Sequence, residues 1–240
     1  MLKYEALAAD IQKSIEDGTL KPNEKLPTVV ELCEMYAVSK ITVRRAMEWL
    51  AENGLVASRR GSGTYVKQRV DLPENPLVTG VNERAQGFSA EHSKRAESVS
   101  SEVYDFDIVK PPAEIANLLN MDEDDFAYYD CRVRLLNDVP IVIEYTYMPI
   151  DLIPGLKRKH LYTSIYAYIH EELGLKIASF HRAIRAVAAT TQEAERLDVN
   201  EGEPLLELEQ VGFLDTGTPF EYSISRNVGS RYTLNNITLA

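Results

Sequence analysis

The chain has 240 residues, of which 45% are hydrophobic and 26% charged, a composition typical of a soluble globular protein with one or two domains. No apolar run approaches the roughly 18 residues of a membrane span, and the first residues are amphipathic, so we expect neither a membrane partner nor a signal peptide. Cys33 and Cys131 lie far apart, which argues against a disulfide framework and predicts reduced thiols in the cytoplasm. The four histidines lack metal-ligand spacing, and we predict no metal and no cofactor.

The net charge of −11 is distributed unevenly along the chain. Residues 1–70 contain 11 Lys and Arg against 9 Asp and Glu, whereas residues 71–240 contain 15 against 28. Within residues 38–70 the balance is 7 basic against 2 acidic residues. Binding to DNA phosphates needs a local basic patch, whatever the charge of the whole chain. The distribution therefore predicts that the N-terminal part binds nucleic acid.

Three helices are predicted at the start of the chain. Apolar residues recur at helical spacing within residues 2–17. The segment Thr28–Glu31 has the pattern of a capping box, so a second helix should begin there and end near Tyr36. After a short turn, Ser39 is expected to cap a third helix, which Gly54 ends.

The predicted third helix has an apolar face and a basic face. Lys40 and Arg44 lie one turn apart on the basic face, with Arg45 beside them. A helix fits the major groove of DNA, where such side chains reach base edges and phosphates. The alternative is that these cations form an ordinary solvated helix face. The residues expected on the buried face are Val43, Ala46, Met47 and Leu50.

A basic hairpin is predicted after the third helix. Two short apolar stretches, residues 55–57 and 64–66, flank a tip that begins at Arg59. Gly61 and Gly63 would let the main chain approach phosphates closely, while Arg59 and Arg60 supply charge. A plain hairpin turn is the alternative. Together with the three helices, the hairpin predicts a winged helix-turn-helix over residues 1–68.

Residues 69–92 are interpreted as a linker, and residues 93–240 as a second domain. The strand order is not a regular βαβ alternation, and the turn at Asn137-Asp138 indicates an antiparallel hairpin, so the predicted fold class is α+β with a mainly antiparallel sheet. Strands are predicted over residues 99–109, 127–136, 141–148, 177–188, 205–214 and 220–228, a closing strand over 232–239, and helices over 112–120, 164–173 and 191–197.

Arg132 and Arg134 alternate along one predicted strand, so both should face the same side of the sheet. Two neighbouring guanidiniums repel each other unless they share an anion, and a phosphate or carboxylate is the natural partner. Ser164 is expected to open a helix whose free N–H groups add a second anion-binding element. The alternative is that the arginines face solvent and pair with acids such as Glu144.

Residues 2–66 resemble the DNA-binding domain of the GntR family of bacterial regulators. The resemblance implies DNA contacts from Ser39, Lys40, Thr42 and Arg44, and from the wing around Gly61. The family usually has Ser-Glu-Arg after the Leu-Pro pair, but this chain has Thr28-Val29-Val30. The resemblance implies that the arginine of this motif contacts DNA. Because Val30 cannot make that contact, we expect an atypical operator preference. The matching segments are Leu26-Pro27, Val38–Arg44, Leu55-Val56 and Arg60–Val66.

The region from about residue 80 to residue 238 resembles the UTRA ligand-binding domain of the HutC-type branch of that family. The resemblance implies a chorismate-lyase-like fold and an effector site. In sugar-phosphate-sensing members the phosphate ligands would correspond to Arg132, Arg134, Ser164 and Tyr166, and the groups that hold the sugar to Phe88, Ser89, Glu144 and Glu221. Val133 and Ile165 lie within the matching segments and belong to the predicted site. Asn227 stands where a tyrosine is common, which leaves the sugar open. The matching segments are Gly87–Ser89, Arg132–Arg134, Glu144-Tyr145, Ser164–Tyr166, Pro219–Ser223 and Gly229–Tyr232.

The sequence thus predicts a DNA-binding transcription regulator and not an enzyme. We expect a cytoplasmic homodimer that represses transcription from operator DNA and responds to a small anionic effector such as a sugar phosphate. Two alternatives stay open. An enzyme is one, because the sensing fold is shared with a lyase. A DNA-binding protein without a ligand is the other.

Overall fold

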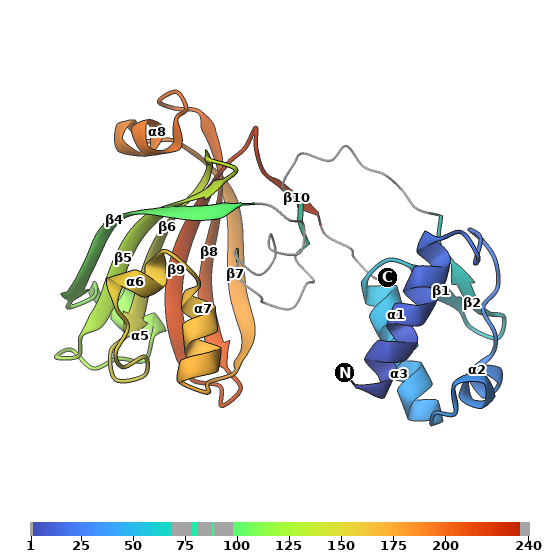
Figure 1. The fold of residues 1–240 in the computed structure, drawn as a ribbon. Coiled ribbons are helices and arrows are strands. Elements are labelled where there is room, and N and C mark those ends of the chain that lie inside the picture. The colour runs from blue at the N-terminus through green and yellow to red at the C-terminus, as the bar shows by residue number, and fades with distance from the viewer. Residues whose placement is uncertain (1, 69–77, 81–87, 89–97, 236–240) are drawn as a thin grey trace. The chain divides into compact units, whose positions relative to one another are not determined.

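The computed structural model of the protein describes residues 2–68, 78–80, 88 and 98–235 (Figure 1). The chain divides into two compact units, of which the first contains the N-terminal 74 residues and the second most of the remainder. The predicted linker, residues 69–92, lies largely outside the described residues, and its bounds stay a prediction. Among the described residues, no helix is both long and apolar enough to span a membrane.

Residues 2–68 of the first unit form three helices and an antiparallel hairpin, as predicted. Thr28 accepts a hydrogen bond from the Glu31 N–H, and the Glu31 carboxylate accepts one from the Thr28 N–H, so the predicted capping box starts the second helix. The helices enclose a core centred on Val43 and Leu50, which are fully buried. The elements are α1 (Lys3–Glu16), α2 (Val29–Tyr36), α3 (Lys40–Glu52), β1 (Val56–Arg59) and β2 (Gly63–Val66).

An antiparallel six-stranded sheet forms the centre of the second unit, with strand order β4-β5-β6-β9-β8-β7 (Figure 1). Asn137 and Asp138 both have positive φ, which is the conformation of the tight turn that joins β5 to β6. The predicted α+β class with a mainly antiparallel sheet is confirmed. The strands are β4 (Val99–Val109), β5 (Ala127–Leu136), β6 (Val139–Pro149), β7 (Ile177–Ala188), β8 (Pro204–Leu214) and β9 (Pro219–Val228).

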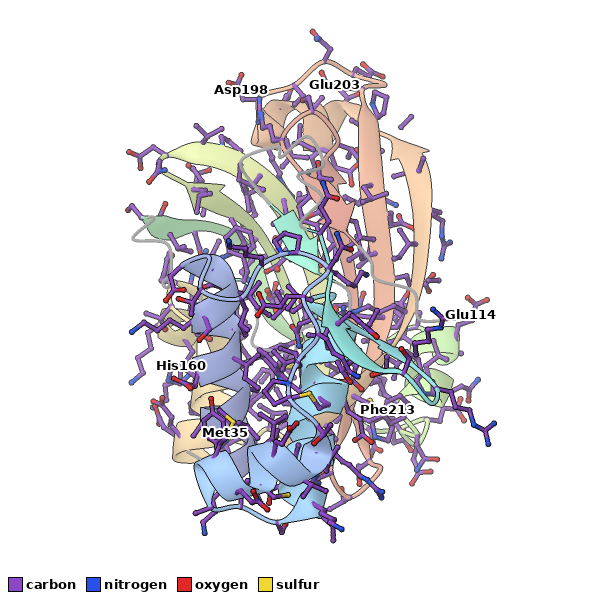
Figure 2. The ribbon with its side chains drawn as sticks, turned by 90° about the vertical axis from the view of Figure 1, so that its right-hand side faces the viewer. Met35, Glu114, His160, Asp198, Glu203 and Phe213 are labelled. Atoms are coloured by element: carbon purple, nitrogen blue, oxygen red, sulfur yellow. The ribbon has the colours of Figure 1, made fainter. Side chains whose placement is uncertain are left out.

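Short helices cover both faces of this sheet. On one face, Leu161 and Ile169 pack with Met148 of β6, and His160 stacks on Tyr168 with 4.1 Å between ring centroids. His160 is labelled among the side chains of Figure 2. On the other face, Leu197 packs in a separate cluster that includes β5 and β6 residues. The helices are α5 (Ala113–Leu118), α6 (Arg158–Leu161), α7 (Ile165–Ala167), the π-helical turn Tyr168–Glu172 that continues α7, and α8 (Thr191–Leu197).

The expectation that residues 232–239 close the main sheet is wrong. Strand β10 (Thr233–Asn235) pairs with β3 (Val78–Gly80) in a separate two-stranded sheet. Alternating apolar residues identify a strand but say nothing about its partner, and the partner here lies in a segment that carries no strand pattern. Helix α6 was not predicted, because four residues are too few to establish a helical period.

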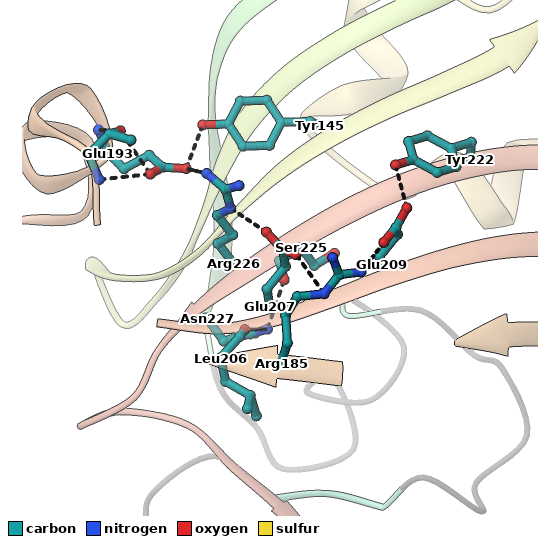
Figure 3. A network of polar contacts seen from close by, with 11 residues as sticks. Tyr145, Arg185, Glu193, Leu206, Glu207, Glu209, Tyr222, Ser225, Arg226 and Asn227 are labelled. Carbon is teal, nitrogen blue, oxygen red and sulfur yellow. Dashed lines mark hydrogen bonds and ion pairs between the residues drawn. The ribbon is translucent and has the colours of Figure 1, made fainter. Parts of the chain in front are cut away.

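A buried polar network fastens α8 to the sheet (Figure 3). Glu193 of α8 is 1% exposed and accepts hydrogen bonds from Tyr145 at 3.0 Å and from Arg226 at 2.6 Å. Arg226 also donates to Glu207 of β8 at 2.7 Å. Burial alone would raise the pKa of Glu193, but hydrogen bonds from Thr190 and Arg226 outweigh it and lower that pKa. The Glu193 carboxylate is therefore ionised, and its burial in the charged form depends on these hydrogen-bond partners.

We expect Arg226→Met to lower the free energy of unfolding by about 3 kcal/mol, because removing one partner of a buried ion pair leaves the other charge uncompensated. Arg185 pairs with the same Glu207, but its side chain is 49% exposed, and Arg185→Met should cost less than about 1 kcal/mol. Denaturant unfolding followed by circular dichroism measures both variants. Equal losses in the two variants would show that the network does not hold α8.

Candidate DNA interface and effector site

The face of α3 that points away from the core carries the predicted DNA contacts. Lys40, Arg44 and Arg45 are exposed, whereas Val43 on the opposite side is fully buried. The guanidinium of Arg45 lies 5.4 Å from the ring centroid of Tyr4 in α1. This cation–π contact holds Arg45 toward α1, so Lys40 and Arg44 are the better placed pair for reaching into a groove.

Two predicted contact residues also organise the start of α3. The Ser39 hydroxyl accepts a hydrogen bond from the Thr42 N–H at 3.2 Å and lies 2.9 Å from the Thr42 hydroxyl. The predicted helix cap is therefore confirmed. Both side chains fix the orientation of the first turn of α3, besides any contact that they make with DNA.

The wing is shorter at its tip than the sequence suggests. Arg59 lies in β1, paired with Gly63 of β2, so only residues 60–62 form the turn. Gly61 has φ +76 and Gly63 φ +134, a conformation that side chains disfavour. A Cβ atom on Gly63 would lie 2.5 Å from Lys25 Cε. Lys25 thus adds a cation beside the tip of the wing, which sequence analysis missed because Lys25 lies far from the hairpin in the chain.

Arg132 and Arg134 lie on the same face of β5, as predicted, but they are only 7% and 2% exposed. Glu144 stands opposite Arg132 in the register of β5 and β6. Its Oε2 accepts a hydrogen bond from Arg132 Nε at 2.8 Å and lies 3.9 Å from Arg134 Nη1. The alternative interpretation was that the two arginines pair with Glu144 and face solvent. The pairing is confirmed, but the exposure to solvent is wrong.

Further contacts hold the two guanidiniums in place. Arg132 Nη1 donates to the main-chain carbonyl of Leu161 at the end of α6, at 3.1 Å. The Arg134 guanidinium lies 5.0 Å from the ring centroid of Phe88, so the predicted residue Phe88 does reach the site.

Ser164 accepts a hydrogen bond from the Ala167 N–H and starts α7 as predicted. Ser89 lies outside the described residues.

Glu221 forms a second polar centre on this face. Its Oε1 accepts hydrogen bonds from Tyr166 at 2.9 Å, Gln210 at 3.1 Å and Ser223 at 2.8 Å. Burial raises the pKa of Glu221 against the opposing effect of these three donors. Burial also raises the pKa of Tyr166 well above its usual value, and the adjacent Glu221 adds to that effect. Tyr166, which was predicted to bind phosphate, is thus hydrogen-bonded directly to Glu221, which was predicted to bind the sugar.

Two buried oxygens near the arginines have no hydrogen-bond partner among the described residues: Ser101 Oγ and Asp130 Oδ1. Ser101 of β4 lies opposite Arg134, and Asp130 precedes Arg132 by two residues on the same face of β5. Burial raises the pKa of Asp130 to about 7, although the nearby Arg132 opposes it and Glu144 adds to it. Buried polar atoms are normally paired, so these two mark a place where a polar ligand could bind. Neither was predicted.

Comparison with known proteins identifies both parts of the chain. Residues 3–66 match the family model described as bacterial regulatory proteins of the gntR family, and residues 94–233 match that of the UTRA domain. The chain belongs to the GntR family. It is a transcriptional regulator with a UTRA effector-binding domain, and the alternative of an enzyme is set aside by this membership.

Full-length relatives of this GntR protein support the assignment. It is 34% identical to the HTH-type transcriptional regulator GmuR of Bacillus subtilis, over 100% of this chain and 99% of the relative. It is 31% identical to the mannosyl-D-glycerate transport/metabolism system repressor MngR of Escherichia coli, over 92% and 89%. The crystal structure of the possible transcriptional regulator YydK from B. subtilis has a TM-score of 0.78 at 30% identity, with both chains fully covered.

Some residues of the predicted site cannot contribute side chains to it. Val133 packs on the opposite face of the sheet with Leu197, and Ile165 packs in the apolar cluster beneath α7. Alternation along β5 explains the first case, because Val133 lies between two arginines that face the other way. Only the main chain of Val133 or Ile165 can contact a ligand. Asn227, which departs from the family pattern, donates to the Leu206 carbonyl at 3.1 Å.

Proposed function

We propose that this GntR regulator is a cytoplasmic repressor that binds operator DNA as a homodimer and is released when a small anion, such as a sugar phosphate, binds to the UTRA domain. The DNA contacts are assigned to the basic face of α3 and to the wing. The effector site is assigned to the face of the sheet that carries Arg132 and Arg134. The observation that carries the proposal is the pair of buried guanidiniums beside two buried oxygens, Ser101 Oγ and Asp130 Oδ1, that have no hydrogen-bond partner among the described residues, because buried polar atoms are normally paired.

The composition of the site favours a ligand with both an anionic group and hydroxyls. The guanidiniums of Arg132 and Arg134 can bind phosphate or carboxylate oxygens in bidentate fashion. Glu144, Glu221 and Asp130 are acceptors for hydroxyl donors. The name of MngR associates that relative with mannosyl-D-glycerate, a sugar that carries a carboxylate. The same combination of groups would suit a sugar phosphate here.

The homodimer follows from the size of the DNA interface. A single recognition helix offers few base contacts, whereas a two-fold dimer on an inverted repeat doubles them. Footprinting on the DNA that flanks the chain's own gene, together with sizing of the complex, tests this part. We expect a protected inverted repeat bound by two chains. A monomer on a single half-site would contradict the proposal.

The surplus of carboxylates over guanidiniums makes effector binding dependent on pH. Burial raises the pKa of Asp130, and among the described residues Glu144 and Glu221 add to this effect while Arg132 and Arg134 oppose it, so an incoming anion favours the protonated form of Asp130. A carboxyl with a pKa of about 7 is ionised at high pH and half protonated at neutral pH. We therefore expect the affinity for a hexose phosphate to increase by about threefold or more when the pH falls from about 8.5 to 7, a range in which the phosphate stays mostly dianionic.

Calorimetry on the wild type and on Asp130→Asn measures this linkage. The amide does not titrate, so the affinity of the variant should be the same at both pH values. An equal pH dependence in the variant and the wild type would assign the proton to another group.

A further inference from the structure

An isoleucine occupies the middle of the proposed DNA-reading face. Ile41 lies in the first turn of α3 and is 74% exposed, more than any other large hydrophobic side chain that the structure describes. Arg44 and Arg45 follow it by three and four residues, so both are its neighbours on the helix surface. The buried residues Val43 and Leu50 lie on the opposite side. Ile41 is thus central on the exposed face, and the cations flank it.

The position separates this isoleucine from ordinary exposed apolar residues. Single exposed hydrophobic side chains are common on protein surfaces and need no explanation. This one, however, must enter the groove if α3 does, because Lys40 and Arg44 cannot approach base edges without it. In the major groove it would displace water from hydrogen-bonding groups of the bases without replacing the lost bonds. The one apolar group that bases present in this groove is the C5 methyl of thymine.

We propose that Ile41 is a specificity-determining residue that recognises a thymine through its C5 methyl group. The inference rests on the proposed binding of operator DNA by α3. It assigns to Ile41 a discrimination that neither flanking cation can provide, since cations read acceptor atoms and phosphates. The contact is apolar, so it should contribute to sequence preference without changing how the affinity depends on salt.

The test uses a duplex that the full-length protein selects from a random pool. Each thymine of that duplex is replaced in turn by deoxyuridine, which removes the methyl group and keeps every hydrogen-bonding atom. At one position we expect the wild type to lose about fourfold in affinity per half-site, and about fifteenfold when both half-sites are changed, as befits one buried methyl group. Ile41→Ala should bind the unmodified duplex with the same deficit and should be insensitive to deoxyuridine at that position.

Arg45→Ala is the matched control, because Arg45 neighbours Ile41 on the helix surface, and its loss should weaken binding to all sequences alike and leave the sensitivity to deoxyuridine intact. The inference is overturned if no deoxyuridine replacement weakens the wild type by more than about twofold. It is also overturned if Ile41→Ala keeps the full sensitivity, since another residue would then contact the methyl group. Failure of the protein to select any sequence would instead contradict the proposed operator binding by α3.

Discussion

Replacing Arg44 with alanine is expected to abolish specific operator binding while the protein stays folded. A base-edge contact of this kind is worth about 1–3 kcal/mol, and a dimer loses it twice, so affinity should fall by about 30-fold or more. The side chain is exposed on α3, opposite the buried Val43, and surface substitutions of this kind usually change stability by less than about 0.5 kcal/mol. Anisotropy with a labelled operator measures the affinity, and thermal unfolding checks the fold.

Arg45→Ala is the matched comparison for Arg44→Ala. The Arg45 guanidinium makes a cation–π contact with Tyr4. We expect the loss of Arg45 to lower the affinity for all DNA sequences by a smaller factor and to make the affinity less dependent on salt. A folded Arg44→Ala protein with unchanged operator affinity would exclude α3 as the reading helix.

The double substitution Arg132→Ala/Arg134→Ala is expected to eliminate binding of phosphorylated sugars, because both charge-assisted donors to the anion disappear together. Calorimetry with phosphorylated and unphosphorylated sugars should detect binding of the phosphorylated form to the wild type only. Since the double variant leaves the partly buried Glu144 without its partners, Arg134→Lys is a second test. It keeps the charge but loses the bidentate fork, and we expect about tenfold weaker binding.

Arg185→Ala controls for the loss of a positive charge. Arg185 lies on β7 and pairs with Glu207 and Glu209 in the network of Figure 3. The affinity of the Arg185→Ala protein for the phosphorylated sugar should match that of the wild type. Full affinity in a folded Arg132→Ala/Arg134→Ala protein would show that the anion binds elsewhere.

Features of the fold that depend on neighbouring residues were predictable from the sequence. The capping box at Thr28, the cap at Ser39 and the tight turn at Asn137-Asp138 are local signals, and the structure has each of them. Alternation along β5 was enough to place Arg132 and Arg134 on one face. The same alternation should have excluded the side chain of Val133, which the resemblance to the family included as part of a contiguous segment.

Contacts between distant segments could not be predicted in this way. Lys25 reaches the wing, and Ser101 lies beside Arg134, only because the fold brings distant segments together. Asp130 is different, because alternation along β5 places it on the face of Arg132, and only its burial depends on the fold. The pairing of β10 with β3 likewise depends on which edge is available and not on the pattern of either strand. The shared hydrogen bond of Tyr166 and Glu221 also depends on packing, here of α7 against the sheet.

The central claim is that an anion at the arginine pair weakens operator binding. A coupling free energy of about 1–3 kcal/mol corresponds to a change in operator affinity of roughly 5–150-fold. The most direct measurement is the dissociation constant of the operator complex in the presence of a panel of hexose phosphates, for the wild type and for Arg132→Ala/Arg134→Ala. We predict that at least one member of the panel weakens operator binding of the wild type by a factor in this range and leaves the double variant unaffected. Operator affinity that no anion in the panel changes, or a double variant that responds like the wild type, would contradict the account.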